Sequence, residues 1–387
     1  MKVVLAQNVS LGRHLALSTY LRGIAKYLAL RKDVQLYLAI QGPPVRIDEL
    51  EPGRIRCLEA DTYSLRGNAV YAWRLYRTLC ELHDAVGFDL VHCLYPNSSL
   101  QAAALFKHTR APEVKTVYDL RSPWIEASVE RLSLGIEASL YRKLAYATES
   151  LLGKRVDGYI FITRGLKDFY EDKLGRSMEP SRIVPSGVDL ELFFPRDPEP
   201  VRKKLGIEED DVVIGYVGVL SVERELEFAL RALRELRDRD RRYRFMFVGD
   251  GDGSARLRRT ALELGLGDGA IFTGRIGFNE VPDYISACDF GLCHLPDIPF
   301  FRHSFPMKVL EYAACGVPVL ASRIPAHEEI AARLPLVLYS NSSPSSLAEA
   351  ILDSTARTFP GVEKVREFGW EGIASRLVAV YRDVMGT

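Results

Sequence analysis

Residues 305–321 read FPMKVLEYAACGVPVLA, and this stretch carries the clearest structural signal in the chain. Pro306 stands where a first helical turn would begin, an apolar helix-forming segment follows, and Gly316 ends it. Proline at the start of a helix and glycine just past its end are typical helix boundaries. Residues 317–321 form a short apolar run, which indicates a buried strand. The stretch therefore predicts a short helix that leads directly into a strand.

Two charged residues lie in the first turn of this predicted helix. Lys308 and Glu311 are three residues apart, so they share one face. The free N–H groups of a helix start, together with a lysine and a carboxylate, can hold a diphosphate and a ribose diol. An ordinary buried helix with two surface charges explains the same spacing equally well.

Length and composition are those of a globular protein. The chain has 387 residues, of which 47% are hydrophobic and 26% charged, and this length predicts two domains. It contains no run of 18 apolar residues, and the first apolar run is too short for a signal peptide, so we expect a cytoplasmic protein. The six cysteines show no C-x-x-C spacing and are expected to be reduced core thiols.

The net charge is zero, but the charges are unevenly distributed. Residues 1–187 carry 26 Lys and Arg against 20 Asp and Glu, and the remaining residues carry the opposite excess. A basic first half favours an anionic membrane surface or a phosphorylated acceptor, unless the asymmetry is chance. Residues 71–77 add aromatic and basic side chains suited to a membrane surface, or these aromatics belong to the core. No dense basic and aromatic stripe indicates nucleic acid.

Apolar runs alternate with helical periodicity along the whole chain, which predicts parallel sheets covered by helices on both faces. A break near residues 185–199 marks the interdomain linker. We expect an α/β protein with two doubly wound domains, residues 1–187 and 188–365, whose strand ends face a central cleft. The expected strands are residues 3–6, 34–40, 90–93, 115–118, 159–162, 212–217, 245–248, 270–273, 290–293 and 317–321, and the expected helices are residues 15–30, 71–86, 225–237, 256–264 and 281–287.

Two loops of the second half are candidate ligand contacts. Gly218 ends a predicted strand, where a glycine lets backbone approach a ligand, and Arg224 lies near the next helix start. Arg224 either binds a phosphate or pairs with a nearby glutamate on the surface. Residues 248–253 read VGDGDG and form either a phosphate loop or, because of the acidic residues, a tight capped turn.

Three loops of the first half are further candidates. Gly12 and Arg13 lie in the loop after the first strand, where they either touch a phosphate or simply connect two elements. Residues 118–124 read YDLRSPW and gather a carboxylate, a guanidinium and an indole on one loop, which favours a site. His92 ends its strand and is either an acceptor contact or a satisfied core histidine.

Seven motifs follow one another along the chain: FDLVH (88–92), RIVPSGVDLELFFP (182–195), GYVG (215–218), FVGDG (247–251), FTGRI (272–276), KVLEYAACGVPVLA (308–321) and FGWEGIASRLVAVY (368–381). Taken in this order, they resemble the family 4 glycosyltransferases of the GT-B fold, and the resemblance covers almost the whole chain. It implies two Rossmann-like domains, with residues 366–387 forming a closing helix that returns to the first. It also implies a retaining transferase that uses a nucleotide-diphosphate sugar, of the UDP or GDP type, without a metal or other cofactor.

The resemblance also assigns roles to residues. It places Glu311 on the ribose hydroxyls, and it places Arg224 and Lys308 on the diphosphate, where fixed cations stabilise the leaving group. The expected catalytic residues are Arg224, Lys308, Asp119 and Arg121. The expected donor contacts are Glu311, Gly218, Gly249, Phe305, Pro306, Met307, Arg275, Ile276, His303, Gly12 and Arg13, and the expected acceptor contacts are His92 and Trp124.

The chain departs from the family pattern at four places. His303 stands where the first glutamate of the Glu-x7-Glu pair is usual, and Val219 replaces a common arginine. Leu11-Gly12 replaces the usual Gly-Gly of the first loop, and Tyr118-Asp119 replaces a common His-Asp. The string YDLRSPW is closer to a variant of relatives that make surface polysaccharides, which makes Asp119 and Arg121 the better candidates for the sugar and acceptor side.

Three functions are compatible with this reading. The first is transfer of a sugar to a glycan or polyprenyl-linked acceptor in surface polysaccharide or glycoconjugate synthesis, at the inner membrane face. The second is a non-catalytic nucleotide-sugar or glycan-binding protein, which the replacements at His303 and Val219 would permit. The third is another GT-B enzyme, such as a nucleotide-sugar epimerase. The sequence does not identify the sugar, the base, the acceptor, the linkage or the oligomeric state.

Overall fold

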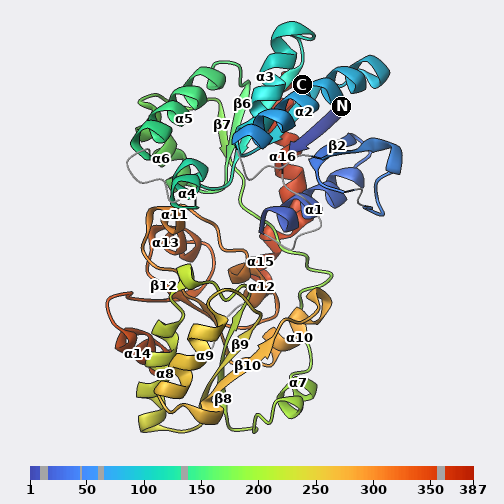
Figure 1. The fold of residues 1–387 in the computed structure, drawn as a ribbon. Helices are drawn as coiled ribbons and strands as arrows, with labels where there is room; N and C mark the ends of the chain where they lie inside the picture. Colours follow the sequence, from blue (N-terminus) through green and yellow to red (C-terminus); the bar gives the residue numbers. More distant parts are fainter. Residues whose placement is uncertain (9–15, 44–45, 60–64, 132–137, 355–361) are drawn as a thin grey trace. The chain divides into compact units, whose positions relative to one another are not determined.

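The computed structural model describes the chain except residues 9–15, 44–45, 60–64, 132–137 and 355–361. The described residues divide into two compact units, each with one sheet in which all paired strands are parallel (Figure 1). Unit 1 comprises Met1–Gly187, His303–Phe305 and Trp370–Thr387, and unit 2 comprises Val188–Arg302 and Pro306–Gly369. The predicted α/β class with two doubly wound sheets is confirmed.

The sheet of unit 1 has seven described strands in the order β3-β2-β1-β4-β5-β6-β7. Its central strands are buried on both faces, which explains why they are nearly continuous apolar runs. The strands are β1 (Lys2–Gln7), β2 (Gln35–Gln41), β3 (Ile55–Leu58), β4 (Leu90–Leu94), β5 (Lys115–Leu120), β6 (Gly158–Phe161) and β7 (Ser181–Ile183).

Helices cover both faces of this sheet. On one face, apolar side chains of α2, α3, α4 and α6 form the main core with alternate strand residues, and α5 packs beside them. On the other face α1 lies against α16, where the Tyr20 and Trp370 ring centroids are 5.7 Å apart. The helices are α1 (Ala16–Ala29), α2 (Leu65–Val86), α3 (Ser98–Thr109), α4 (Trp124–Arg131), α5 (Ala138–Gly153), α6 (Arg164–Leu174) and α16 (Trp370–Met385).

The sheet of unit 2 has six described strands in the order β10-β9-β8-β11-β12-β13. Helices α8, α9 and α14 cover one face and contribute most of its core. The strands are β8 (Val212–Val217), β9 (Tyr243–Val248), β10 (Ala270–Gly274), β11 (Phe290–Cys293), β12 (Val319–Ser322) and β13 (Leu336–Tyr339). The helices are α7 (Glu199–Lys204), α8 (Glu227–Arg239), α9 (Ser254–Glu263), α10 (Val281–Ser286), α11 (Pro299–Arg302), α12 (Lys308–Ala314), α13 (Pro325–Ala331), α14 (Pro344–Ser354) and α15 (Val362–Val365).

The predicted strands and helices are present, and the differences lie mostly at edges and boundaries. The sequence prediction missed the edge strands β3 and β7 of the first sheet and β13 of the second. Because β13 pairs with β12, the predicted strand 317–321 is not the last strand of its sheet. That strand begins only at Val319, after Pro318, which has no N–H to donate to a ladder. The predicted helix 71–86 begins earlier, at Leu65. All six cysteines are free, four of them buried, as expected of core thiols.

Candidate functional site

The strand order of unit 2 reverses between β8 and β11, and adjacent strand ends diverge at such a point to leave a crevice for a ligand. Helix α12 is fixed there by Tyr312. Its hydroxyl accepts a hydrogen bond from the Val217 N–H at 2.8 Å and donates to the Leu292 carbonyl at 3.3 Å. A Cβ at Gly291 would lie 2.4 Å from the Tyr312 ring, so only glycine leaves room for it. One buried tyrosine thus ties α12 to both strands.

The predicted end of α12 is confirmed. Gly316 has a φ of +77°, and the Val317 N–H reaches back to the Tyr312 carbonyl at 3.0 Å, which is the usual closing motif of a helix that ends in glycine. The predicted start is two residues early. The helix begins at Lys308, and Pro306 lies in the turn before it. This boundary makes Lys308 the first helical residue, at the edge of the crevice.

Lys308 has an unusual environment. Its Nζ is buried and has no hydrogen-bond partner in the part of the chain that the structure describes. It lies 3.5 Å from the centroid of the Tyr216 ring, and a Cβ at Gly218 would be 3.3 Å from it. A buried ammonium group whose contact is an aromatic face lacks the counter-charge that such groups normally have. Such an ammonium group can pair with an anion that approaches the backbone of Gly218.

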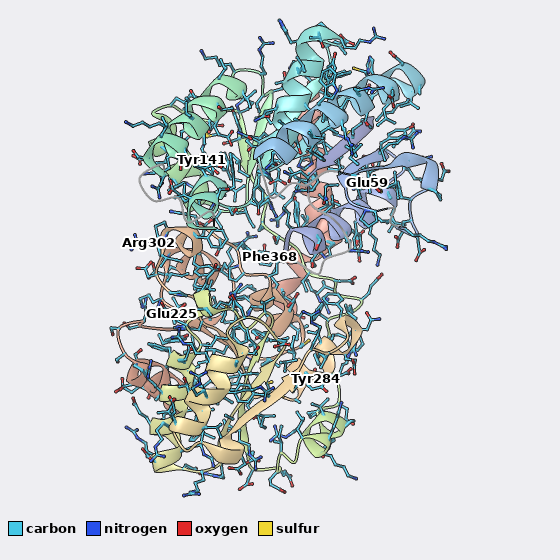
Figure 2. The ribbon with its side chains drawn as sticks, viewed as in Figure 1. Glu59, Tyr141, Glu225, Tyr284, Arg302 and Phe368 are labelled. Carbon is cyan, nitrogen blue, oxygen red and sulfur yellow. The ribbon has the colours of Figure 1, made fainter. Side chains whose placement is uncertain are left out.

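Arg224 is a second cation at these strand ends. It closes the short turn Val222–Arg224, is half-buried, and its guanidinium carbon lies 5.5 Å from the centroid of the Phe301 ring. No described carboxylate pairs with it. Glu225, labelled in Figure 2, follows with a φ of +49°, the one positive φ among the described non-glycine residues. A strained residue beside an unpaired arginine is typical of a ligand loop.

The thiol of Cys293, at the end of β11, shows that the two cations lie close to one strand end. Burial raises its pKa to about 11, while Lys308 and Arg224 both lower it. His327 is completely buried beside this thiol, with 3.4 Å between Cys293 Sγ and Nε2. Burial lowers the pKa of His327 to about 4, so this imidazole is neutral and leaves the positive charge to Lys308 and Arg224.

Glu311 lies one turn after Lys308, on the face that the sequence spacing predicted. Burial raises the pKa of Glu311 to about 7, although the nearby Lys308 lowers it. The carboxylate accepts no hydrogen bond from the described residues. A half-buried, unpaired carboxylate beside an unpaired ammonium group can accept hydrogen bonds from a ligand diol while the cation holds an anion.

The glycine-rich turn after β9 supports the Gly218 loop. A Cβ at Gly249 would lie 2.0 Å from the Gly218 carbonyl oxygen, and Gly249 has a φ of +132°. Asp250 Oδ1 accepts hydrogen bonds from the Gly251 N–H at 2.9 Å and from Ser254 Oγ at 2.6 Å. Of the two sequence interpretations, the capped turn describes this geometry. Gly249 supports the Gly218 loop, and its direct contact with a donor stays a prediction.

The remaining predicted donor contacts lie in different parts of the two units. Arg275 and Ile276 follow β10, the edge strand next to β9, and Arg275 is exposed. His303 and Phe305 belong to unit 1, where the His303 ring lies 4.7 Å from the Phe169 ring and Phe305 packs on the main core. Met307 and Pro306 precede α12 in unit 2. Gly12 and Arg13 lie outside the described residues.

In unit 1, Asp119 is the centre of a buried network at the carboxyl end of β5. Its Oδ2 accepts a hydrogen bond from Tyr20 at 2.8 Å and lies 3.2 Å from His92 Nε2. The other ring nitrogen of His92 is 2.7 Å from the hydroxyl of Tyr381. Burial raises the pKa of Asp119, but Arg121 and His92 outweigh this effect and hold it below its usual value. His92 thus has the geometry of a satisfied core histidine, and its contact with an acceptor stays a prediction.

Arg121 and Trp124 are also engaged in this unit. Arg121 donates to the Val184 carbonyl at 2.7 Å and to Ser186 Oγ at 3.2 Å, and its guanidinium carbon lies 3.7 Å from the Tyr20 ring centroid. Trp124 is 9% exposed, and its Nε1 donates to Glu149 at 2.7 Å. As placed, these side chains and Asp119 position the loop, and direct contact with a substrate remains a prediction.

Comparison with protein families assigns the chain. The model described as Glycosyltransferase Family 4 matches residues 17–192, and the model described as Glycosyl transferases group 1 matches residues 211–356. The chain belongs to the family 4 glycosyltransferases. The two matches lie in the two units and include Asp119, Arg224, Lys308 and Glu311.

Named relatives and solved structures agree with this family. The chain is 24% identical to a D-inositol 3-phosphate glycosyltransferase of Stackebrandtia nassauensis over 61% of its own length and 53% of that protein. A sucrose-phosphate synthase of Thermosynechococcus elongatus has a TM-score of 0.75, 18% identity, and coverage of 100% of this chain and 99% of that one. Anabaena Alr3699/HepE in complex with UDP has a TM-score of 0.74 and 18% identity, with 99% and 100% covered. These structures show the GT-B fold.

The sequence reasoning on this glycosyltransferase missed the aromatic residues that hold the site. Tyr216 and Tyr312 lie inside the motifs GYVG and KVLEYAACG, but their contacts with Lys308 and with the strand ends depend on the fold. Tyr381, in the closing helix, and Glu149, in α5, carried no local signal. Glu149 is 4% exposed and accepts hydrogen bonds from Tyr118 and Trp124, and burial raises its pKa to about 7.

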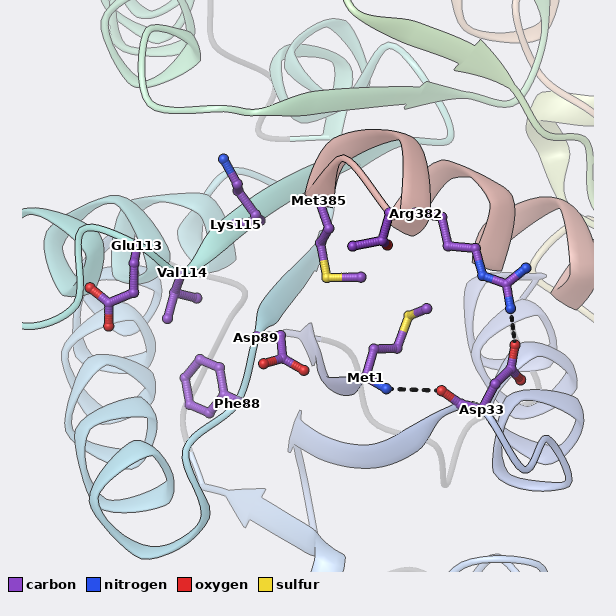
Figure 3. Close-up of a pocket in the computed structure, with 10 residues that line it drawn as sticks. Met1, Asp33, Phe88, Asp89, Glu113, Val114, Lys115, Arg382 and Met385 are labelled. Carbon is purple, nitrogen blue, oxygen red and sulfur yellow. Dashed lines mark hydrogen bonds and ion pairs between the residues drawn. The ribbon is translucent and has the colours of Figure 1, made fainter.

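A cavity of about 620 Å³ in unit 1 lies apart from these residues (Figure 3). It is at the amino ends of the strands, next to Asp89 and Lys115, whereas ligands bind at the carboxyl ends in this fold. Asp33 and Arg382 close one side of it with an ion pair of 2.7 Å. Among the described residues, no group of three His, Cys, Asp or Glu could hold a metal ion, and no helix is long and apolar enough to cross a bilayer.

Proposed function

We propose that the chain transfers a sugar, with retention of configuration, from a nucleotide-diphosphate sugar to a glycan or lipid-linked acceptor. The observation that carries the proposal is the buried Nζ of Lys308, which has no hydrogen-bond partner in the described structure and lies against Gly218 and Tyr216. A diphosphate placed there receives its counter-charge from Lys308 and from Arg224. Glu311 then accepts hydrogen bonds from the ribose hydroxyls.

The two cations supply the chemistry that sugar transfer requires. When the bond between the sugar and the diphosphate breaks, negative charge builds up on the leaving diphosphate. Fixed positive groups aimed at that charge lower the barrier because they need no reorganisation. Lys308 is held in place by α12 and Arg224 by its short strained turn. We therefore propose that transfer proceeds with these two side chains and without a metal ion.

We propose a donor of the UDP or GDP type. A solved structural neighbour, Alr3699/HepE, was crystallised with UDP, which supports a nucleotide donor in this fold. We propose that Arg275 and Ile276, which directly follow β10, contact the base, mainly through backbone groups. Nothing on these two residues selects one base, so the donor panel below includes four.

We propose surface polysaccharide or glycoconjugate synthesis as the process and peripheral contact with the inner membrane face through unit 1. Residues 71–77 were the predicted contact. Tyr71 is completely buried, but Trp73 is 57% exposed and stacks on Tyr76, with 5.4 Å between ring centroids. A relative is named for D-inositol 3-phosphate, so this cyclitol phosphate belongs in the acceptor panel with lipid-linked sugars.

The test is a thermal-shift panel of UDP-, GDP-, ADP- and dTDP-sugars with EDTA present. A ligand at 100 times its Kd stabilises the folded state by about 2.7 kcal/mol, a shift of several degrees. We expect one nucleotide class to shift the midpoint, and Lys308→Met to abolish that shift. Acceptor-dependent release of nucleotide then demonstrates transfer, and NMR of the product shows whether configuration is retained.

Each alternative gives a different result in the same experiments. A non-catalytic binding protein shows the donor shift but releases no nucleotide with any acceptor. A nucleotide-sugar epimerase changes the donor without an acceptor. Absence of a shift with all four nucleotides would contradict the proposed donor site.

A further inference from the structure

Unit 1 has a one-sided distribution of exposed apolar side chains. Among the described residues of this unit, seven large hydrophobic side chains are exposed, and all but Leu30 lie on the α2, α3 and α5 layer. These three helices are neighbours on the same face of the sheet (Figure 1). The six are Val70, Trp73, Leu105, Leu140, Leu144 and Leu151.

Helix α5 has the most continuous stripe. Leu140, Leu144 and Leu151 are 61%, 61% and 66% exposed, and their spacing of four and seven residues places them on one face of the helix. In a helix that packs on a folded domain, most leucine side chains are buried. Three leucines with more than half of their surface exposed on one helix face therefore require an explanation.

The orientation of α5 is fixed from its inner side. Glu149 Oε1 accepts hydrogen bonds from Tyr118 at 2.9 Å and from Trp124 Nε1 at 2.7 Å. Near its start, Arg142 pairs with Glu126 at 2.7 Å. These contacts hold the opposite face of the helix against α4 and Tyr118 of β5. The helix therefore cannot rotate to bury its leucines without breaking buried hydrogen bonds.

On the described part of α5 and the two residues after it, the exposed charged side chains are positive. Lys143 lies between the first two leucines and Lys154 follows the third, and both are exposed without a carboxylate partner among the described residues. The described part of α5 holds a single acidic residue, Glu149, which points inward. Arg155 follows Lys154 and is also exposed. An apolar stripe flanked by lysines matches the boundary between acyl chains and anionic headgroups.

We propose that the outer face of α5 docks on an anionic membrane surface, with Leu140, Leu144 and Leu151 in the headgroup region and Lys143 and Lys154 on the headgroups. This proposal rests on the proposed function in one respect: the enzyme would encounter a lipid-linked acceptor at that membrane surface. A second copy of the chain is a poorer occupant, because a two-fold contact through this stripe would bring its lysines together.

The test is sedimentation with vesicles of phosphatidylcholine, alone or with one part in three of phosphatidylglycerol. We expect the wild-type chain to bind the anionic vesicles, and high salt to weaken that binding. The triple variant Leu140→Gln/Leu144→Gln/Leu151→Gln should bind at least about tenfold more weakly, because buried apolar area sets the strength of such binding. Lys143→Glu/Lys154→Glu should lose the preference for anionic vesicles.

Matched controls separate docking from folding. Leu30→Gln replaces a leucine of similar exposure (59%) outside the α5 layer and should bind like the wild-type chain. Each variant should keep the wild-type unfolding temperature and donor thermal shift. Wild-type binding by the triple variant overturns the proposal, as does no binding by the wild-type chain. A wild-type dimer that this variant makes monomeric would assign the stripe to a second copy. If nucleotide sugars cause no thermal shift in the wild-type chain, the proposed function is rejected, but the vesicle-binding result remains valid.

Discussion

At the scale of single residues, the candidate site depends on groups that lack the partners they would normally have. Among the described residues, Lys308 contacts an aromatic ring and a glycine backbone in place of a carboxylate, and the half-buried Glu311 accepts no hydrogen bond. Arg224 has a ring in place of an ion pair. Three ionisable groups without ion-pair partners among the described residues, all beside the crevice between β8 and β11, lower the free energy of unfolding. A ligand that pairs with all three would offset this loss of stability.

Arg224→Ala should lower turnover much more than it raises the KM for the donor. The negative charge of the leaving diphosphate grows in the transition state, so the guanidinium stabilises that state more than the bound substrate. We expect kcat to fall by about 10²–10³, measured by nucleotide release under saturating donor. Arg231→Ala, an exposed arginine of α8, is the control. An increase in KM with unchanged kcat would contradict the role.

Donor affinity should fall as the pH is lowered through about 7. Burial raises the pKa of Glu311 to about 7, and only the ionised carboxylate accepts hydrogen bonds from both ribose hydroxyls. Between pH 8 and pH 6 the ionised fraction falls about tenfold, and the Kd should rise by about the same factor. Calorimetry with a nucleotide sugar measures this, because its esterified diphosphate does not titrate near neutral pH. Glu311→Gln should bind weakly and show no such dependence.

Glu149→Gln should change how stability depends on pH. Burial raises the folded-state pKa of Glu149 from 4.5 to about 7, so the stability from its protonation is complete below pH 4.5 and is lost as the pH rises through 7. The amide of the variant still accepts hydrogen bonds from Tyr118 and Trp124 but cannot ionise. The stability of the variant relative to wild type should therefore rise by about 3 kcal/mol between acidic and alkaline pH. Urea unfolding at several pH values measures this, and parallel curves would refute it.

At the scale of elements, the site is built from two interlocked strand-to-helix loops of unit 2. The Gly218 N–H bonds to the Val248 carbonyl at 2.9 Å, and the Leu220 N–H bonds to the Asp250 carbonyl at 3.1 Å. The loop after β9 thus fixes the backbone that the diphosphate would approach. Glycine is required where the two backbones meet, and the acidic residues of this turn serve as caps.

Gly249→Ala should destabilise unit 2 and weaken donor binding together. The new Cβ would lie 2.0 Å from the Gly218 carbonyl oxygen, and a φ of +132° is unfavourable for any side chain. We expect a loss of about 3 kcal/mol or more. Gly267→Ala, at a φ of +52° with open space around it, is the matched control and should cost about 1 kcal/mol. Equal effects in denaturant unfolding would show that the clash is relieved elsewhere.

At this scale the sequence was a good guide where the signal is local. The helix 308–314 was predictable from Gly316 and the apolar run, since a helix end is decided by a few neighbouring residues. The edge strands were not, because β3 and β13 are short and partly exposed and so lack a continuous apolar run. The closed Asp119 network was also unpredictable, because its partner Tyr381 is 289 positions from His92.

At the scale of the whole molecule, unit 1 is assembled from distant parts of the chain. It combines residues 1–187 with residues 303–305 and 370–387. Unit 2 occupies the two stretches between them, residues 188–302 and 306–369. The returning helix α16 contributes Tyr381, which is completely buried and bonded to His92. Stability of this unit therefore depends on a helix that sequence order places after the other unit.

Tyr381→Phe should destabilise unit 1 by about 1–3 kcal/mol, because the ring still fits but His92 Nδ1 loses its buried partner at 2.7 Å. Denaturant unfolding measures the loss. Tyr141→Phe is the control. Tyr141, labelled in Figure 2, is a half-buried tyrosine of α5 whose hydroxyl has no hydrogen bond among the described residues. Equal stability of the Tyr381→Phe and wild-type chains would mean that water replaces the hydroxyl.

The shared hydrogen bond between the Val188 N–H and the Phe368 carbonyl, 2.9 Å long, joins the two segments that border unit 2. Unit 2 is thus closed on itself before α16 begins. During synthesis on the ribosome, unit 2 can reach its native structure while unit 1 still waits for α16. In that interval His92 has no hydroxyl to bond and α1 has no Trp370 to pack on. The order of translation therefore predicts that the half with the earliest residues completes its fold last, and that its incomplete core is open to misfolding until then.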